Sequence, residues 1–527
     1  MKLSRWIFGL MVGMATVNSP ASDAGASESD AGQIRQLREA LVQLQANFER
    51  VVREQQAQIE SLKQQLAALQ AAASSAAPPD ATAGTAPEAA TPSASSPAAV
   101  SDRRWSPTDP IRFGRGSAYA DLGLVATVAA GGSTARDIEG GTQLGGHDPN
   151  QRGFTLQGVE MSLQGAVDPY FRGNVNLLFG LDGDGDSLLE VEEAWLETVS
   201  LPGNLQLRAG QLLTDFGRIN TQHPHQWAFV DSPLAVARLL GPDGLRNPGA
   251  RLGWLLPLPF FAELSLSVQN SHGETAAPFR AGGGHHHGGE AEELPFGFRH
   301  ADNDRGVRGV DDLLFAPRLA VSFDLTESQT LLLGASAAFG PNNSGADGDT
   351  RTQIFGLDAY WKWKPARAHG GFPFVSWQAE ALLRRYELGA VDWDENGNGA
   401  LDEGEVEDAA TGLPAVLGRE TVTDWGFYTQ WLYGFRKGWV AGVRFDFVTG
   451  ERADYERGGL LLNGEPLGRD PLRHRRWRVS PNLTWYPTEF SKLRLQYNYD
   501  DRRDIGVDHS VWLQAEFVLG AHAAHKF

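Results

Sequence analysis

The chain has no cysteine and, beyond its first residues, no long apolar run. The absence of cysteine excludes disulfides, thiolate metal ligands and cysteine nucleophiles. A transmembrane helix needs about 20 apolar residues in succession, so helices beyond the N-terminus cannot anchor this chain in a membrane. If the protein is a membrane protein, it must therefore cross the bilayer as a closed β-barrel, the other fold that satisfies backbone hydrogen bonds in lipid.

Positive charge is also scarce. The chain carries 46 Lys and Arg against 65 Asp and Glu, a net charge of −19. Phosphate backbones require a basic surface, so we expect no nucleic-acid partner. The chain also lacks a GxSxG elbow, an HExxH pair, and a GxGxxG loop opening a helix after a strand. We therefore expect a protein that is not an enzyme, with a barrel hydrolase as a minor alternative.

The C-terminal region shows a two-residue hydrophobic period. Trp477, Val479, Leu483 and Trp485 alternate with Arg478, Ser480, Asn482 and Thr484, and after a tight turn the pattern resumes in Leu493, Leu495, Tyr497 and Tyr499. Alternation over about ten residues, with aromatics near the strand ends, is typical of a membrane β-barrel. A half-buried soluble sheet alternates in the same way, so the assignment depends on repetition along the chain.

Short turns separate the strand-like segments at regular intervals. We predict them at Val167–Pro169, Leu201–Asn204, Pro257–Pro259, Thr326–Ser328, Lys364–Pro373, Phe435–Gly438 and Pro487–Ser491. Seven tight turns alternating with long loops predict an all-β transmembrane barrel of about 16 antiparallel strands over residues 112–527. The alternatives are a soluble β-sandwich and a β-propeller. In a bacterial outer-membrane barrel the short turns face the periplasm and the long loops face outward.

The N-terminal fifth of the chain differs in composition. We predict a signal peptide over residues 1–21, a linker over 22–32, a periplasmic α-helical coiled coil over 33–72, and an Ala/Ser/Pro-rich linker over 73–111. The helical segment keeps three- and four-residue spacings of Leu and Ile with one shift of phase. The alternative for this segment is a single amphipathic helix packed on the barrel.

Part of the chain resembles a known family, the phosphate-selective porin O/P-like outer-membrane porins. The similar segments are VEEAWLETVSLPGNLQLRAGQLLTDFGR at Val191–Arg218, the final hairpin containing YPTEFSKLRLQYNY, and the terminal Phe527. The resemblance implies a 16-stranded homotrimeric channel in the lipid of a Gram-negative outer membrane, through which small solutes diffuse. It also implies that the outer-membrane assembly machinery reads Phe527.

Alternation assigns charged side chains of both signs to the lumen. The predicted pore-lining and selectivity residues are Arg172, Arg208, Arg218, Arg246, Arg384, Arg444, Arg478 and Arg494. Rings of basic side chains favour anions and acidic rings favour cations. In porins similar to this chain, the third long connection, here Asp215–Arg251, folds inward. Its candidates for contact with solute are Arg218, Arg238, Arg246 and Arg251, with His223 and His225; the alternative is that they brace the loop against the wall.

Two loops carry metal-ligand patterns, although no cofactor is required for a channel. Asp394, Asn396, Asn398, Ala400, Asp402 and Glu405 match the ligand positions of an EF-hand calcium loop, with Gly399 at its turn. His285, His286 and His287 could bind zinc weakly. The alternative for both loops is a solvated polar surface.

The sequence thus predicts an outer-membrane porin for passive diffusion of small solutes, with anions among the candidates. The alternative is an outer-membrane metal receptor or metal-binding protein, in which the His-rich and Asp-rich extracellular loops capture ions and the barrel is a platform. Solute identity and charge preference are left open.

Overall fold

The structure is a computed structural model that describes residues 111–115, 118–166, 168–181, 185–280, 295–301, 306–394 and 396–520. The chain divides into two units, Met1–Ser101 and Asp102–Phe527, and the description concerns the second. The predicted signal peptide, coiled coil and linkers lie outside the described residues, except for Ile111. The histidine run at residues 285–287 and the terminal Phe527 also lie outside them.

The described residues contain a main sheet of seventeen antiparallel strands, and sixteen of these close into a barrel when the short β1 is set aside. The first and last, β2 and β23, pair from Gly123↔Gly520 to Ser133↔Ser510, which completes the ring. The barrel strands are β2 (Ala118–Ser133), β3 (Gly153–Ala166), β4 (Phe171–Leu181), β5 (Ser187–Thr198), β6 (Leu205–Leu213), β7 (Arg246–Leu255), β8 (Phe261–Asn270), β9 (Leu313–Thr326), β10 (Gln329–Pro341), β11 (Arg351–Trp363), β12 (Phe374–Leu388), β17 (Glu420–Arg436), β18 (Trp439–Gly450), β21 (Arg476–Thr488), β22 (Ser491–Arg502) and β23 (Gly506–Gly520).

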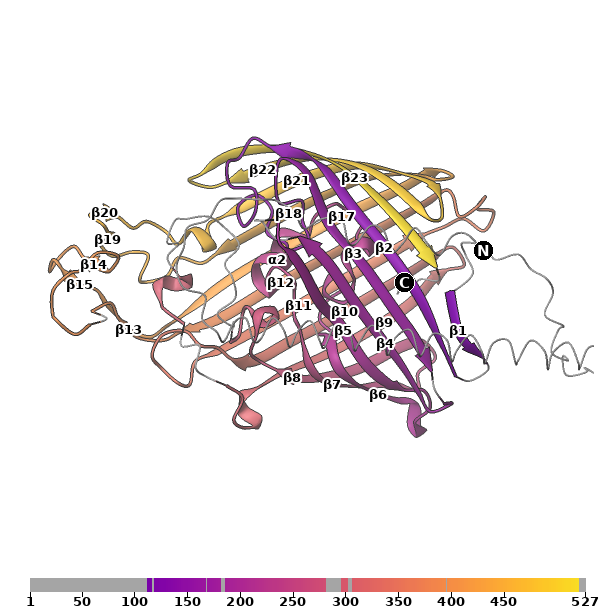
Figure 1. Ribbon diagram of the computed structural model, residues 1–527, viewed down its shortest axis with the longest axis horizontal. Coiled ribbons are helices and arrows are strands. Elements are labelled where there is room, and N and C mark those ends of the chain that lie inside the picture. The colour runs from indigo at the N-terminus through magenta and orange to yellow at the C-terminus, as the bar shows by residue number, and fades with distance from the viewer. Residues whose placement is uncertain are drawn as a thin grey trace, which may run out of the picture. The chain divides into compact units, whose positions relative to one another are not determined.

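Short connections gather at one end of this barrel. Each of the seven predicted turns falls between two consecutive strands, from β3–β4 to β21–β22. The other connections, most of them longer, lie at the opposite end, on the left in Figure 1. The predicted strand count and antiparallel topology are therefore confirmed, and the soluble sandwich and propeller are excluded.

Smaller elements lie beside the barrel strands and in the loops. Strand β1 (Ile111–Arg115) pairs with the first residues of β2. The long loops carry short strands and single helical turns: β13 (Val391–Asp392), β14 (Val406–Asp408), β15 (Leu413–Pro414), β16 (Val416–Leu417), β19 (Leu460–Leu462), β20 (Glu465–Pro466), η4 (Glu274–Ala276), η5 (Phe296–Phe298), η6 (Val310–Asp312) and η7 (Pro471–Arg473). Another turn, η1 (Pro202–Asn204), lies in the short β5–β6 connection.

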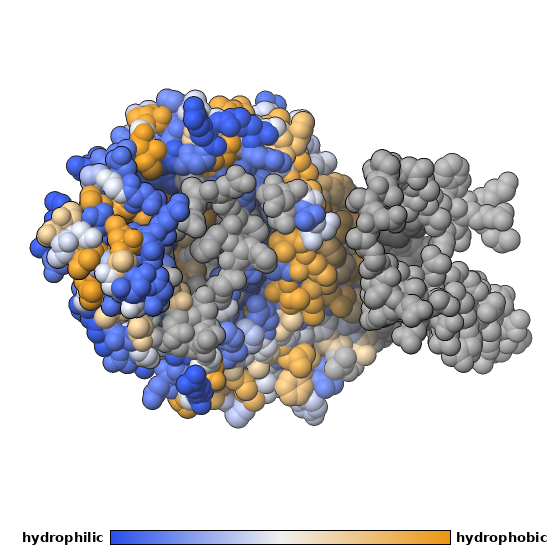
Figure 2. Space-filling model, turned by 60° about the vertical axis from the view of Figure 1, so that its left-hand side comes forward, coloured by the Kyte–Doolittle hydropathy of each residue, from blue (hydrophilic) through white to orange (hydrophobic). Residues whose placement is uncertain are grey.

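The barrel wall presents apolar side chains outward. On β22 the inward Arg494, Gln496 and Asn498 are buried, whereas Leu495 is 51% exposed. The same division continues around the wall, with exposed Leu357, Trp431, Leu513 and Phe517. Hydrophilic residues dominate the loop-end rim in Figure 2. Among the described helices, none is long and apolar enough to cross a membrane.

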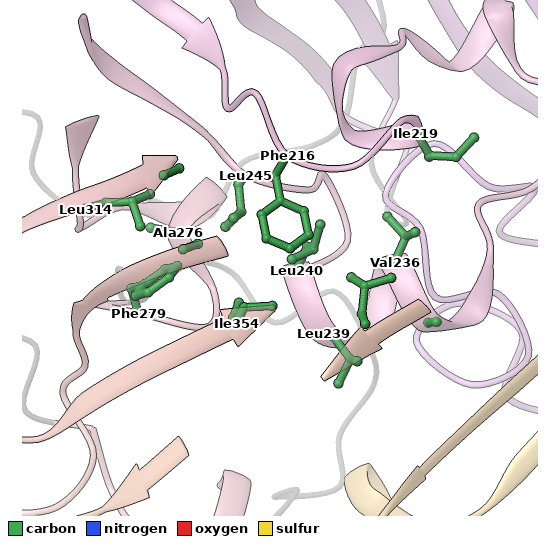
Figure 3. Packing of buried hydrophobic residues seen from close by; sticks show 14 of the residues in the cluster. Phe216, Ile219, Val236, Leu239, Leu240, Leu245, Ala276, Phe279, Leu314 and Ile354 are labelled. Atoms are coloured by element: carbon green, nitrogen blue, oxygen red, sulfur yellow. The ribbon is translucent and has the colours of Figure 1, made fainter. Parts of the chain in front are cut away.

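The sequence predicted charged side chains along the lumen, but part of the inner wall of the barrel is apolar. The inward loop, residues 214–245, contains η2 (Ile219–Thr221), η3 (Pro224–Gln226) and α2 (Leu234–Leu240). Its apolar side chains pack against inward residues of β9–β17 in one buried cluster (Figure 3): Phe216, Ile219, Ala235, Val236, Leu239, Leu240 and Leu245 from the loop, with Ala276 and Phe279 beyond β8, and Leu314, Ala316, Ala338, Ile354, Leu382 and Tyr428. This part of the wall is apolar because the loop, rather than water, covers it.

The outward position of Leu495 generates a prediction. Leu495→Arg should lower the free energy of unfolding in lipid by about 2–4 kcal/mol, the cost of a cation near the midplane on the lipid face. Urea unfolding of the protein in vesicles, followed by tryptophan fluorescence, measures this cost. The control is Leu472→Arg, because Leu472 is also exposed but lies in a loop. Equal effects of the two substitutions would contradict a lipid-facing wall.

Candidate functional site: the inward loop and the lumen

The inward loop is held to the barrel wall by a buried carboxylate. Asp231 accepts a hydrogen bond from Arg444 Nη2 at 2.6 Å and one from Arg478 Nη1 at 3.0 Å. The side-chain amides of Gln496 and Asn498 also donate to it, each at 2.9 Å. Burial raises the pKa of Asp231, but the two guanidinium groups more than compensate and hold it below its usual range.

Further donors from the wall bind the loop backbone. Arg494 donates to the carbonyl oxygens of Phe229 at 3.0 Å and Trp227 at 2.9 Å. Lys492 Nζ donates to the His225 carbonyl at 3.0 Å. These bonds satisfy carbonyl groups that loop backbone would otherwise bury without partners. The loop therefore crosses the lumen from an apolar contact on one part of the wall to a polar contact on another.

Four of the predicted pore-lining arginines form ion pairs with neighbouring carboxylates: Arg172, Arg208, Arg246 and Arg384. Arg172 and Arg208 share Glu197 near the turn end, at 2.6 and 2.5 Å. Arg384 contacts Asp424 at 2.8 Å. The remaining pair joins Arg246 to Glu190. The neighbouring carboxylates balance most of these positive charges. The role of the arginines in selectivity stays a prediction.

Arg218, like Arg494, has neutral hydrogen-bond partners. Its guanidinium group donates to Gln378 Oε1 at 2.9 Å and lies 4.0 Å from the ring centroid of Tyr360. It borders a pocket of about 210 Å³, together with Lys362 and the inward loop. The other lining residues are Ile219, Gln222, Gln226, Ala228, Tyr360, Ser376, Gln378, Gln430 and Leu432. No carboxylate lines this pocket within the described ranges, so its charge is positive.

A second polar cluster lies where the inward loop meets β3 and β5. Glu160, Glu192, Glu193 and His223 are all buried there. His223 Nδ1 lies 3.1 Å from Glu192 Oε2 and 3.6 Å from Glu160 Oε1, and its Nε2 lies 3.1 Å from Glu193 Oε2. Burial lowers the pKa of His223, but the carboxylates more than compensate and raise it well above its usual range. The electrostatic potential at this imidazole is therefore strongly negative.

The cluster exists because β5 carries a bulge. Asn176 pairs with Glu193 and Leu177 with Val191, so Glu192 is the extra residue and both glutamates turn inward. Strict alternation would send one of two consecutive residues outward. The sequence pattern consequently placed His223 in the loop but did not reveal Glu192 and Glu193. The EE pair inside an otherwise alternating strand was the available signal.

The predicted calcium loop is compact in the structure. Asp402 Oδ2 accepts from the side-chain amides of Asn396 at 2.6 Å and Asn398 at 2.9 Å. Asp394 accepts from the backbone of Asn398 and Gly399, at 3.0 and 2.8 Å. Gly399 has φ +71°, the left-handed conformation that this turn requires. The candidate ligands thus gather in one turn, and calcium binding stays a prediction.

The closed ring of sixteen strands with an apolar exterior is the architecture of bacterial outer-membrane barrels. No family model matches the chain. An uncharacterized protein of Aquifex aeolicus (strain VF5) is 29% identical over 406 residues, covering 73% of each chain.

Similar solved structures include the outer membrane channel DcaP of Acinetobacter baumannii, with a TM-score of 0.44 and 13% identity over 76% of this chain and 97% of that one. OmpF of Salmonella typhi, in complex with daunomycin, has a TM-score of 0.43 and 10% identity over 78% and 100%. An anion-selective porin from Comamonas acidovorans has a TM-score of 0.43 and 7% identity over 76% and 100%.

The buried Asp231 generates a second prediction. Asp231→Asn keeps the shape of the side chain but removes its charge. Because Arg444 keeps Asp446 and Arg478 keeps Asp500 as partners, the weakened hydrogen bonds should cost about 1–3 kcal/mol of unfolding free energy. Urea unfolding in vesicles measures this loss. Asp454→Asn is the control, since the Asp454–Arg457 pair is exposed and should contribute less than about 1 kcal/mol. A loss for Asp231→Asn no larger than that of the control would contradict the anchoring role.

The calcium loop generates a third prediction. Calcium should raise the melting temperature of the wild-type protein, and the combined change Asp394→Ala and Glu405→Ala should abolish this rise because both removed carboxylates are candidate ligands. Circular dichroism melts with calcium and with a chelator measure it. Glu403→Ala, at a non-ligand position of the same loop, should preserve the rise. Persistence of the rise in the double variant would show that the loop assignment is wrong.

Proposed function

We propose that the protein is an outer-membrane channel for passive diffusion of small solutes, with a preference for anions. The observation that carries this proposal is a closed barrel with an apolar exterior, whose lumen is narrowed by a long inward loop. Such a loop sets the width and charge of the route through a water-filled barrel. Homotrimeric assembly and recognition of Phe527 by the assembly machinery remain predictions.

The anion preference comes from the pocket on the turn side of the inward loop. Most charges on the wall are neutralised in pairs, so they contribute little to the net field along the route. Arg218 and Lys362 both line the pocket, and its described lining residues include no Asp or Glu. At about 4 Å in water, one such charge changes the free energy of an ion by about 1 kcal/mol, which is about fivefold in occupancy.

Conductance across planar bilayers tests the proposal. The purified protein should give an ohmic current, and its reversal potential in a salt gradient should indicate anion selectivity. Arg218→Gln together with Lys362→Gln should lower the anion-to-cation permeability ratio. The decrease should be about fivefold if one of the two charges acts on the ion, and larger if both do.

A matched control separates the pocket from the general charge of the protein. Arg457→Gln removes a positive charge from an exposed loop residue and should leave the reversal potential unchanged. Absence of any conductance from correctly folded protein would overturn the channel proposal. An unchanged selectivity in the double variant would overturn only the role assigned to the pocket.

A further inference from the structure

The cluster of Glu160, Glu192, Glu193 and His223 has the composition of a metal site. Three carboxylates and an imidazole converge in a place where water is largely excluded. Buried carboxylates are costly unless they are paired or bound to a metal. Arg246 lies 4.0 Å from Glu192 and also pairs with Glu190.

The distances between the donor atoms suit a single ion. One ligand atom from each of Glu160, Glu192 and His223 lies within 4.8 Å of the other two. Ligand atoms bonded to one ion at about 2.0–2.2 Å lie about 3–3.6 Å apart. The two measured separations from His223 Nδ1 are 3.1 Å and 3.6 Å, to Glu192 and Glu160.

The groups around these three residues also suit such a site. A ligating histidine usually donates its second ring N–H to a carboxylate, which fixes the ring and its tautomer. Glu193 and the side-chain amide of Asn176 both lie at that position, 3.1 Å and 2.8 Å from His223 Nε2. The second oxygen of Glu160 lies 2.7 Å from His225 Nδ1, so this carboxylate is oriented as well.

A small cavity adjoins the cluster. Its volume is about 30 Å³, and His147, Glu192, His223 and Asp243 are among its lining residues. That volume is enough for a water molecule. Its lining is mostly apolar, but Glu192, His223 and Asp243 offer polar atoms to a water that completes the coordination of an ion. The cavity belongs to the same junction of loop and wall.

We propose that Glu160, Glu192 and the Nδ1 atom of His223 bind one divalent transition-metal ion, and that Glu193 positions the imidazole. Mixed nitrogen and carboxylate donors suit Zn²⁺, Mn²⁺ or Fe²⁺ better than Ca²⁺, which prefers six to eight oxygen ligands. Since Glu160 and Glu192 lie on strands and His223 on the inward loop, the ion fastens the loop to β3 and β5. The buried carboxylates of Glu160, Glu192 and Glu193 would attract such a cation.

Manganese binding to the purified full chain in detergent tests the site. The background protein carries Asp394→Ala, His285→Ser, His286→Ser and His287→Ser. These changes remove candidate ligands from the two other loops that could bind a metal. The background protein should bind one Mn²⁺ per chain, and pulsed electron paramagnetic resonance should detect a nitrogen coupling from imidazole. Zn²⁺ should displace the bound Mn²⁺, whereas Ca²⁺ at the same concentration should not.

Substitutions in this background identify which residues bind the metal ion. His223→Gln should remove the nitrogen coupling, and the near-isosteric Glu192→Gln should weaken binding even if His223→Gln fails to fold. Glu193→Gln should weaken binding about 10–100-fold, as loss of a supporting carboxylate does. His369→Gln, at an exposed turn histidine, should change nothing. Far-ultraviolet circular dichroism verifies that each variant is folded.

The proposal would be overturned if the folded background protein bound neither Mn²⁺ nor Zn²⁺. In that case the cluster is a protonated histidine held by carboxylates. It would equally be overturned if bound Mn²⁺ showed no nitrogen coupling, or if folded Glu192→Gln protein bound Mn²⁺ as tightly as the background protein.

Discussion

The arrangement of the lumen depends on the buried contact between Asp231 and the arginines Arg444 and Arg478. A loop of 32 residues inside a barrel needs partners for its backbone and for its own apolar side chains. Strands β18–β22 supply arginine, lysine and amide donors, and the adjoining strands β9–β17 supply an apolar surface. Because the loop uses both kinds of anchor, neither set of strands could change alone without releasing it. Most arginines of the lumen therefore fix the geometry of the route, and few remain to act on solute.

The barrel itself could be predicted from the sequence because lipid enforces a simple rule on every strand. Apolar residues such as Leu493 and Leu495 must alternate with inward residues such as Arg494, and turns must interrupt them at bilayer spacing. The inner face obeys no comparable rule. Ile354 and Leu382 point inward and are apolar because the loop covers them, and nothing in the local pattern distinguishes them from lipid-facing residues.

The candidate sites were harder to predict for related reasons. The ligand positions from Asp394 to Glu405 follow a local spacing, so the loop could be found by pattern. Glu160, Glu192 and His223 come from three separate segments, and only the bulge in β5 directs Glu192 inward. Distant contacts of this kind depend on register and on the path of a loop, which hydrophobic periodicity does not encode.

Strand β1 has a consequence for how the ring closes. It pairs with Ala118–Leu122 of β2, while β23 pairs with the adjoining Gly123–Ser133, so the two strands lie end to end along one edge. A β-carbon added at Gly520 would lie 2.4 Å from the Leu122 carbonyl oxygen. Only glycine, which has no β-carbon, therefore fits at this position, where β23 adjoins β1 along β2. A slip of one residue would exchange the lipid and lumen faces of β23, and it would also bring a residue with a β-carbon to the place of Gly520.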